Sequence, residues 1–373
     1  TGRFSPALLT YVSTLRFTGD VHAMPEGTVF FPNEPMLRVT APLPQAQLVE
    51  TRLMNLLNFQ TMIASKAARS VLVAGKRPLI DFGLRRAHGA EAGLLAARAG
   101  YLAGFSGTAT VLAGMQFGIP TYGTMAHSFV QAHTNETEAF EHFAQAQPDN
   151  VVLLIDTYDT EAAARKVVAL APRLKEQHIT IKGVRLDSGD LADHARKVRR
   201  ILDEGNLSHV HILASGNLDE YKLEQLVSGG APIDSFAVGT AMTTSADAPS
   251  LDCAYKLQEY AGRPCRKRSE GKATWPGRKQ VWRRYGPDGC LASDVVSLAS
   301  DHQTGVTLLQ LVMERGQRLS PLSSLDESRQ RVATELSRLP KPLRSLESSS
   351  PYDVTIAPAL RDLAQSVDER GSS

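Results

Sequence analysis

The feature that most constrains this chain is an alternation of short apolar runs and amphipathic helical stretches, which begins near residue 77. Repeated strand–helix units of this kind are typical of a parallel sheet whose strands are joined by helical crossovers. About six such units suit either a barrel or a doubly wound sheet, and the periodicity does not decide between them. The predicted strands cover 119–122, 151–155, 179–186, 210–214 and 233–238, and the predicted helices cover 90–102, 136–146, 159–176, 189–204 and 218–228.

A different pattern precedes and follows this region. Short apolar segments separated by turn-forming sequences such as PEG, PNEP and SEGK indicate short antiparallel strands. A long amphipathic helix is predicted over 48–63, where leucines recur at spacings of three and four. The short predicted strands cover 28–31, 36–39, 254–260, 265–269 and 280–285.

These patterns predict a discontinuous small domain around one larger domain. We expect residues 16–45 to be part of a small β-rich domain and 46–250 to form the larger α/β core. Residues 251–290 then return to the small domain. The remainder, 291–373, is a C-terminal segment with a charged helix over 326–339, which Pro340 would end, and a mobile RGSS tail.

Composition excludes several broad classes of protein. The chain has 42% hydrophobic and 21% charged residues, which is ordinary globular usage and unlike a disordered chain. No apolar run approaches the ~18 residues of a membrane span, and the start carries no signal-peptide pattern. A net charge of +2 is too balanced for a general nucleic-acid binder. The three widely spaced cysteines form no CxxC motif and favour a reducing cytoplasm.

Small, hydroxyl and charged residues follow nearly every predicted strand of the core. Ligands of parallel α/β folds bind at the carboxyl ends of strands, and glycine lets a phosphate approach the backbone there. Each residue alone is also an ordinary helix cap, but the whole series at one edge predicts a ligand site. No P-loop, GxGxxG, HExxH or GxSxG motif is present. The series comprises Asp81, Arg85, Arg86, His88, Ser106, Gly107, Thr108, Gly123, Thr124, His127, Ser128, Asp156, Thr157, Arg185, Asp187, Ser188, Gly189, Asp190, Ser215, Gly216, Asn217, Gly239 and Thr240.

Several of these segments together resemble the nicotinate phosphoribosyltransferase family. The resemblance runs from about residue 8 to at least 290 and is carried by DFGLRRAHG, FSGTATVLAG, GTMAHSFV, VRLDSGDL and SFAVGTAM. It implies an irregular, TIM-like α/β barrel of the type II phosphoribosyltransferases with a smaller α/β sandwich domain. It also implies transfer of phosphoribose from phosphoribosyl diphosphate (PRPP) to nicotinate, with ATP hydrolysis through a phosphohistidine, in NAD salvage. The resemblance further implies a homodimer as the working unit.

The resemblance assigns residues on the nicotinate side of the site. His127 matches the phosphorylated histidine, although a histidine bonded at a helix start has the same appearance in sequence. Thr124, Ser128 and Arg185 match nicotinate-binding positions, and a guanidinium both pairs with a carboxylate and stacks on a ring. Asp187 is expected near the ribose or ring, where its charge favours an oxocarbenium-like transition state. A helix cap remains the alternative for Asp187.

The resemblance also predicts a cradle for the phosphates of PRPP. We expect Mg²⁺ with the diphosphate, held mostly by the substrate rather than by a protein metal site. Arg85 is predicted to help to hold pyrophosphate, with a structural ion pair as its alternative. The basic cluster 263–279 frames either a phosphate entrance or a solvated face. The predicted phosphate-binding residues are Thr240, Gly239, Ser188, Gly189, Ser215, Gly216 and Arg85.

The resemblance is incomplete at the start of the chain. Family members carry an N-terminal D-L-Y-x-x-T-M type segment, and this sequence opens partway into the family pattern.

Three alternatives stand beside the favoured activity: a nicotinamide phosphoribosyltransferase, a quinolinate phosphoribosyltransferase, and a truncated non-catalytic homologue. Quinolinate has two carboxylates and needs further basic residues, whereas nicotinamide has none and gains less from Arg185.

Overall fold

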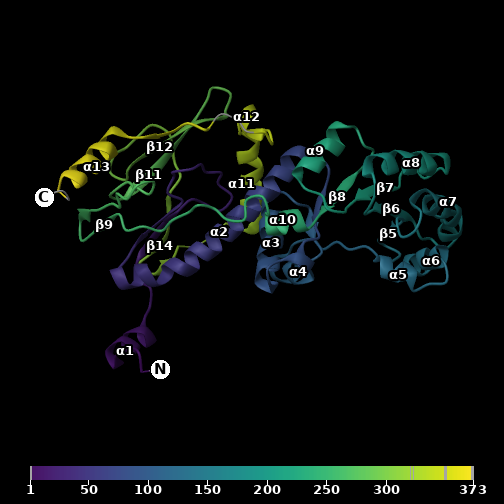
Figure 1. The fold of residues 1–373 in the computed structure, drawn as a ribbon, viewed down its shortest axis with the longest axis horizontal. Helices are drawn as coiled ribbons and strands as arrows, with labels where there is room; N and C mark the ends of the chain where they lie inside the picture. Colours follow the sequence, from purple (N-terminus) through teal and green to yellow (C-terminus); the bar gives the residue numbers. More distant parts are fainter. Residues whose placement is uncertain (1, 320, 322, 348–350, 371–373) are drawn as a thin grey trace. The chain divides into compact units, whose positions relative to one another are not determined.

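The computed structural model describes residues 2–319, 321, 323–347 and 351–370, in two compact units (Figure 1). The central unit is Phe59–Leu251, and the terminal unit combines Thr1–Asn58 with Asp252–Ser373. Helix α2 (Leu43–Ala74) begins in the terminal unit and ends in the central unit. The predicted tail at 370–373 falls, except for Arg370, outside the described residues.

The central unit is built on one six-stranded parallel sheet in the order β4-β3-β8-β7-β6-β5. The sheet curls into a half-barrel, with β4 and β5 at its two edges. This is the α/β architecture that the resemblance implied. The strands are β3 (Leu79–Asp81), β4 (Gly107–Thr108), β5 (Val151–Leu154), β6 (Ile181–Leu186), β7 (His211–Ala214) and β8 (Ser235–Val238).

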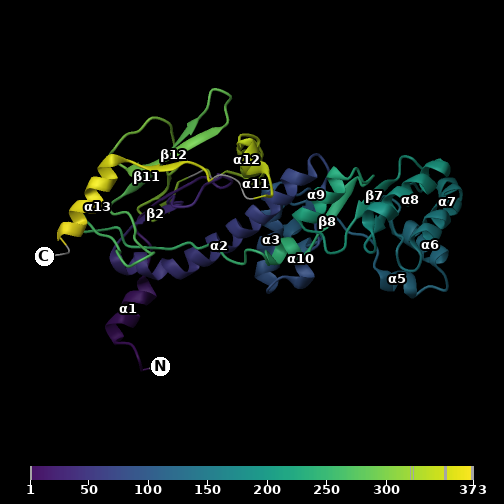
Figure 2. The ribbon, with the colours of Figure 1, turned by 45° about the horizontal axis from the view of Figure 1, so that its top comes forward.

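Helices alternate with these strands as the sequence pattern predicts. Helices α6, α7 and α8 pack against strands β5 to β7 (Figures 1 and 2). Asn135, Asp159, Asp190 and Asp219 cap α6, α7, α8 and α9, each accepting a bond from a first-turn backbone N–H. The helices are α3 (Ala90–Ala103), α4 (Val111–Phe117), α5 (His127–Gln131), α6 (Glu136–Ala146), α7 (Thr160–Glu176), α8 (Leu191–Glu204), α9 (Glu220–Ser228) and α10 (Thr240–Thr244).

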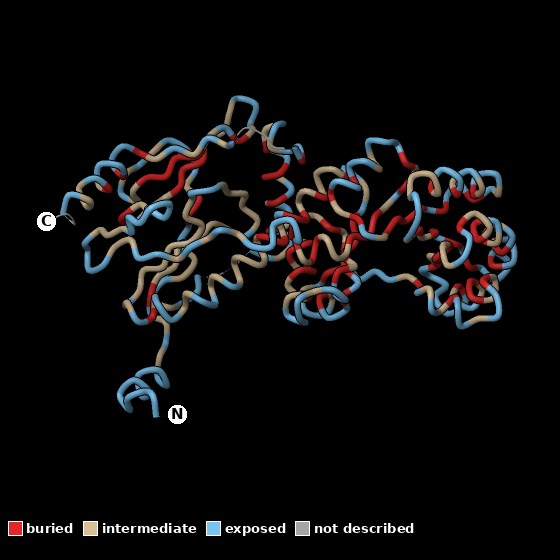
Figure 3. Tube along the Cα trace, viewed as in Figure 1, coloured by how far each residue is buried: buried red, intermediate tan, exposed pale blue. Residues whose placement is uncertain are grey.

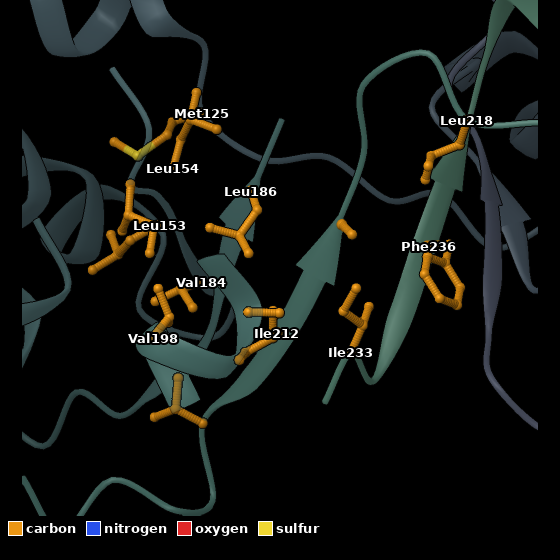
Figure 4. Close-up of a cluster of buried hydrophobic side chains, with 14 of the residues drawn as sticks. Met125, Leu153, Leu154, Val184, Leu186, Val198, Ile212, Leu218, Ile233 and Phe236 are labelled. Carbon is orange, nitrogen blue, oxygen red and sulfur yellow. The ribbon is translucent and has the colours of Figure 1, made fainter. Parts of the chain in front are cut away.

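The core of the central unit lies between the sheet and its helices. The strands are buried along most of their length, as Figure 3 shows. Figure 4 shows Val184 and Leu186 of β6, Ile212 of β7 and Phe236 of β8 in one cluster with Val198 of α8. Burial on both faces explains why these strands read as continuous apolar runs rather than as alternating patterns.

The terminal unit contains two four-stranded sheets, in the orders β15-β14-β1-β2 and β13-β11-β12-β16, and a short β9-β10 hairpin. Its helices are α1 (Pro6–Thr14), the first part of α2, α11 (Leu325–Ser337), α12 (Lys341–Arg344) and α13 (Pro358–Arg370). The strands are β1 (Asp20–Ala23), β2 (Leu37–Thr40), β9 (Glu259–Tyr260), β10 (Arg263–Pro264), β11 (Lys279–Tyr285), β12 (Leu291–Leu298), β13 (Val306–Thr307), β14 (Gln310–Glu314), β15 (Gln317–Arg318) and β16 (Val354–Ile356).

Some of the short predicted strands were wrong. Residues 28–31 form no strand, because the Phe31 N–H is bonded to the Glu34 carboxylate at 3.0 Å instead of to a neighbouring strand. The ring of Phe31 stacks on Tyr352 with 3.7 Å between centroids. Residues 265–269 also form no strand, and the predicted strand at 254–260 shrinks to Glu259–Tyr260.

The terminal unit encloses a buried ionic cluster. Arg283 is fully buried and donates to Asp294 at 2.6 Å and to Glu335 at 2.7 Å. Tyr352 also donates to Asp294. Burial, with the neighbouring Asp294, raises the pKa of the Glu34 carboxyl to about 9. The cluster therefore joins the Arg283 guanidinium to Asp294 and Glu335, and the nearby Glu34 carboxyl favours its neutral form.

In the described part of the chain, no helix has the length and apolar character that crossing a membrane requires. Cys253, Cys265 and Cys290 are all free thiols.

Candidate active site

The candidate site lies along the carboxyl edge of the parallel sheet. Because all six strands point the same way, the residues that end them share this edge. The prediction that the strand ends lie at one edge is confirmed for these six strands, whereas the predicted strand at 119–122 is only a single bridge from Thr121 to Thr108. The residues at the edge are Asp81, Thr108, Asp156, Arg185, Asp187, Ser215, Gly239 and Thr240.

Arg185, near the end of β6, is the centre of a hydrogen-bond network. Its Nε donates to the Ser215 hydroxyl at 2.8 Å and its Nη1 to the Thr124 hydroxyl at 2.9 Å. Its Nη2 donates to Asp187 Oδ1 at 2.8 Å. The guanidinium carbon lies 5.4 Å from the centroid of the Phe82 ring. These contacts hold the guanidinium in one plane and leave it 15% exposed at the edge.

Asp187 is fixed in its ionised form by the same network. Partial burial opposes ionisation, but the Ser215 hydroxyl and Arg185 outweigh it and hold the pKa of the Asp187 carboxyl below its ordinary value. Ser215 and Arg185 both bond to Oδ1. Among the described residues, none is bonded to Oδ2. A carboxylate with one free oxygen is thus available to a ligand.

A second carboxylate, Asp156, follows β5 and joins the histidine to this network. Its side chain is 1% exposed, and Oδ1 lies 3.2 Å from His127 Nε2. Oδ2 accepts the Asp187 N–H at 3.0 Å and the Ser188 hydroxyl at 2.6 Å. Asp156 therefore connects His127, the first residue of α5, to the loop after β6.

Glycines bring the loops close to each other. Gly216 has a φ of +96°, and a Cβ there would lie 2.0 Å from the carbonyl oxygen of Asp187. No other residue fits such a position without moving the neighbouring loop. Gly189, with a φ of +73°, follows Ser188 in the adjoining loop. The two glycine loops after β6 and β7 are therefore packed backbone to backbone.

The end of β8 carries a further polar contact. Gly239 precedes α10, and the first residue of that helix, Thr240, accepts a bond from Arg86 Nη1 at 2.8 Å. Arg86 makes this contact, and its neighbour Arg85 is exposed. The structure places Ser128 on the exposed surface of α5, next to His127. The roles predicted for Arg85 and Ser128 stay predictions.

Asp81, Phe82 and Asp156 were not assigned a role from sequence. Asp81 is buried and accepts the Gly83 N–H at 2.8 Å and the Thr108 hydroxyl at 2.7 Å. Burial raises the pKa of its carboxyl. Phe82 packs beside Arg185. The DFG sequence at the end of β3 was the available signal, but the contact from Phe82 to Arg185 depends on strand order and is not visible in sequence.

A relative of known activity decides the family. The nicotinate phosphoribosyltransferase pncB2 of Mycobacterium tuberculosis is 46% identical over 357 residues, which cover 95% of this chain and 76% of that protein. This chain belongs to the nicotinate phosphoribosyltransferase family. The family models match along its length: the nicotinate phosphoribosyltransferase (NAPRTase) family over residues 78–263, its N-terminal domain over 1–58 and its C-terminal domain over 301–364.

Solved structures of nicotinate phosphoribosyltransferases and related proteins agree in fold. The human nicotinic acid phosphoribosyltransferase superimposes with a TM-score of 0.86 at 30% identity, over 98% of this chain and 85% of that one. A nicotinate-nucleotide pyrophosphorylase from Pyrococcus furiosus superimposes with a TM-score of 0.75 at 28% identity, over 89% and 84%. Since the N-terminal domain of the family matches residues 1–58, part of that domain is present in this sequence.

The basic cluster 263–279 lies in the terminal unit of this nicotinate phosphoribosyltransferase family member, where several of its charges are paired. Arg266 and Arg268 both lie near Asp368 of α13, and Arg278 pairs with Glu259. Lys279 donates to two backbone carbonyls. Ion pairs and backbone bonds therefore account for much of this cluster.

Proposed function

We propose that this protein is a nicotinate phosphoribosyltransferase that forms nicotinate mononucleotide and pyrophosphate from nicotinate and PRPP. The observation that carries the proposal is the fixed Arg185 guanidinium, held by Thr124, Ser215 and Asp187 beside the Phe82 ring. A planar, oriented guanidinium suits both the carboxylate and the ring of a pyridine carboxylate. The product supplies the nicotinate branch of NAD salvage.

The proposed chemistry is a substitution at C1 of the ribose. The bond between C1 and the diphosphate oxygen breaks, and the pyridine nitrogen forms a new bond to C1. Positive charge grows on the ribose as the diphosphate leaves, so a nearby carboxylate lowers the barrier. Asp187 has the low pKa that this role needs and keeps Oδ2 free of bonds to the described residues.

We propose that the glycine-rich loops hold the phosphates of PRPP. Gly216 lies directly against the Asp187 carbonyl, which keeps the loop after β7 close to the loop after β6. Arg86 and Thr240 provide a cationic and a hydroxyl partner at the end of β8. Ser188, Gly189, Ser215 and Gly239 complete the proposed cradle, with Arg85 beside it.

Mg²⁺ is proposed to accompany the diphosphate. The ion prefers phosphate oxygens and water, with one or two carboxylates, and neutralises the leaving group when bound. Because Asp187 Oδ2 is assigned to the ribose, the diphosphate oxygens and water are proposed as the main ligands of the ion.

His127 is proposed to accept the γ-phosphate of ATP. With Nε2 directed at Asp156 Oδ1, the neutral tautomer that donates from Nε2 keeps its lone pair on Nδ1. Nδ1 would form the N–P bond as the bond from the γ-phosphorus to the ADP oxygen breaks. Asp156 is then a positioning residue, which also links the modified ring to the Asp187 N–H.

Labelling tests the phosphohistidine. The purified chain is incubated with γ-³²P-labelled ATP, beside His127→Ala and the control His178→Ala. We expect an acid-labile label on the wild type and on His178→Ala, and none on His127→Ala. Equal labelling of His127→Ala would reject this role for His127.

A panel of bases tests the substrate and separates the alternatives. Turnover with PRPP is compared for nicotinate, nicotinamide and quinolinate by separating the nucleotide products. We expect nicotinate to have the highest kcat/KM, by at least tenfold. Preference for either of the other bases would replace the proposed activity with the matching phosphoribosyltransferase. No turnover of any base by the folded chain would favour the non-catalytic homologue.

A homodimer and a cytoplasmic location are further proposals. Helix α4 carries three exposed apolar residues, with exposed fractions of 64% for Val111, 52% for Leu112 and 79% for Met115. Exposed apolar patches of this kind mark interaction sites. Sedimentation of the wild type as a dimer, and of Met115→Lys as a monomer, would support this interface.

The three free thiols support a reducing compartment, such as the proposed cytoplasm.

A further inference from the structure

A cavity opens at the opposite edge of the central sheet. It has a volume of about 380 Å³, and its lining comes from the loop before β3, from α8 and from the loop before β8. Sites for small molecules commonly have volumes of about 300–1,000 Å³. Since the lining loops precede strands, the cavity lies at the amino ends of the sheet, away from the candidate active site. Its lining residues are Lys76, Arg77, Arg199, Ala231, Pro232, Ile233 and Asp234.

The charge of this lining is positive. Lys76, Arg77 and Arg199 give three cations against the single carboxylate of Asp234, which leaves two positive charges. That carboxylate is already engaged, because its Oδ2 accepts the N–H of Ile212 at 2.7 Å. Because the Arg199 guanidinium is also paired with the Asp203 carboxylate at 2.9 Å, Lys76 and Arg77 carry the charge that an anionic ligand would neutralise.

The two arginines have different parts in the cavity. All three nitrogens of Arg199 are engaged: Nε donates to the Asp203 carboxylate at 2.9 Å, and the two terminal nitrogens donate to the carbonyls of Val210 and Leu207 at 2.8 and 3.0 Å. Arg77 donates only its Nε, to the carbonyl of Ile233 at 3.0 Å. Within the described part of the chain, its two terminal nitrogens have no partner, and neither has the ammonium of the exposed Lys76. These donors remain available to a ligand.

We propose that this cavity binds a small organic phosphate. The fork of Arg77 matches two phosphate oxygens, and Lys76 adds a point charge beside it. Ala231, Pro232 and Ile233 supply an apolar wall for the carbon part of the ligand. The site is separate from the phosphate cradle at the carboxyl edge and does not depend on the proposed activity.

Calorimetric titration with glycerol 3-phosphate tests the site at low and at physiological salt. The full chain is compared with Lys76→Glu, with Arg77→Gln and with the control Arg200→Glu, a charge change on the exposed face of the same helix as Arg199. Melting temperatures check that each variant is folded. Lys76→Glu is the safer variant, because that exposed side chain makes no hydrogen bond or ion pair with the described residues.

The expected result is a binding event that weakens at least tenfold in Lys76→Glu and in Arg77→Gln, and persists in Arg200→Glu. Binding at the carboxyl edge would remain in all variants as a separate event. Titrations that are identical in the wild type and in both cavity variants would overturn the proposal. Equal weakening by Arg200→Glu would also overturn it, because it would show only a general effect of net charge.

Discussion

The single side chain of Arg185 connects three segments of the candidate site. Three of its nitrogens donate to three different residues, from the loops after β6 and β7 and from the segment that leads into α5. An ammonium cannot reproduce this, because it has one donor atom and no plane. The network therefore requires the planar, three-nitrogen guanidinium of arginine as well as its positive charge.

Arg185→Lys is expected to lower kcat/KM for nicotinate by at least tenfold. The variant keeps the charge but loses the fork that we place against the nicotinate carboxylate, so nicotinate should lose its advantage over nicotinamide. Steady-state kinetics with both bases measures the change, with Arg200→Lys as a matched control on an exposed surface. An unchanged ratio of the two bases would contradict the placement of nicotinate against Arg185.

Glu34 makes the stability of the protein depend on pH. Burial raises the pKa of its carboxyl from the ordinary 4.5 to about 9 in the folded chain. Between these pH values the unfolded chain has lost a proton that the folded chain keeps, so the free energy of unfolding falls as pH rises. This contribution is fully present below pH 4.5 and is lost as the pH approaches about 9.

Glu34→Gln is expected to remove that slope. Glutamine stays neutral, so the variant should gain stability relative to the wild type as the pH is raised from about 5 to about 9. Urea unfolding at several pH values measures the difference, with Glu26→Gln as the control. Parallel pH profiles of the wild type and Glu34→Gln would show that Glu34 is ionised in the folded protein.

At the scale of elements, the loops between strands and helices determine the site. Gly216→Ala is expected to reduce kcat/KM at least tenfold, because its Cβ would meet the Asp187 carbonyl and displace the loop that holds Ser215. Gly230→Ala is the matched control: its φ is also positive, at +62°, but a Cβ there meets nothing within 4 Å. That variant should lose about 1 kcal/mol of stability and keep its activity. Equal activity losses in both variants would indicate backbone strain rather than loop displacement.

Elements with a strong local signal could be predicted from sequence. Strands β5 to β8 are buried on both faces and appear as apolar runs, and their helices carry cap residues. The predicted strand at 119–122 is only a single bridge from Thr121 to Thr108. Residues 28–31 have strand-like composition, yet the Glu34 carboxylate takes the Phe31 N–H. Whether such a short segment forms a strand depends on hydrogen bonds to polar side chains or to distant parts of the chain. These bonds cannot be predicted from the local sequence pattern.

At the scale of the whole molecule, the terminal unit combines both ends of the sequence. The return of the chain near 250 was visible as a change of pattern, but the curl of the sheet was not, because periodicity does not encode strand order. The same limit applies to the site. Hydroxyl and charged residues at strand ends were visible, whereas the roles of Asp156 and Phe82 depend on which strands are neighbours.

A single-turnover reaction tests the proposed phosphoribosyl transfer most directly. The purified chain, in excess, is mixed with PRPP, Mg²⁺ and nicotinate, with and without ATP, and nicotinate mononucleotide and pyrophosphate are both quantified. We expect equal amounts of the two products, dependent on PRPP and lost in Asp187→Asn. A folded chain that binds PRPP and nicotinate but forms neither product under either condition would contradict it.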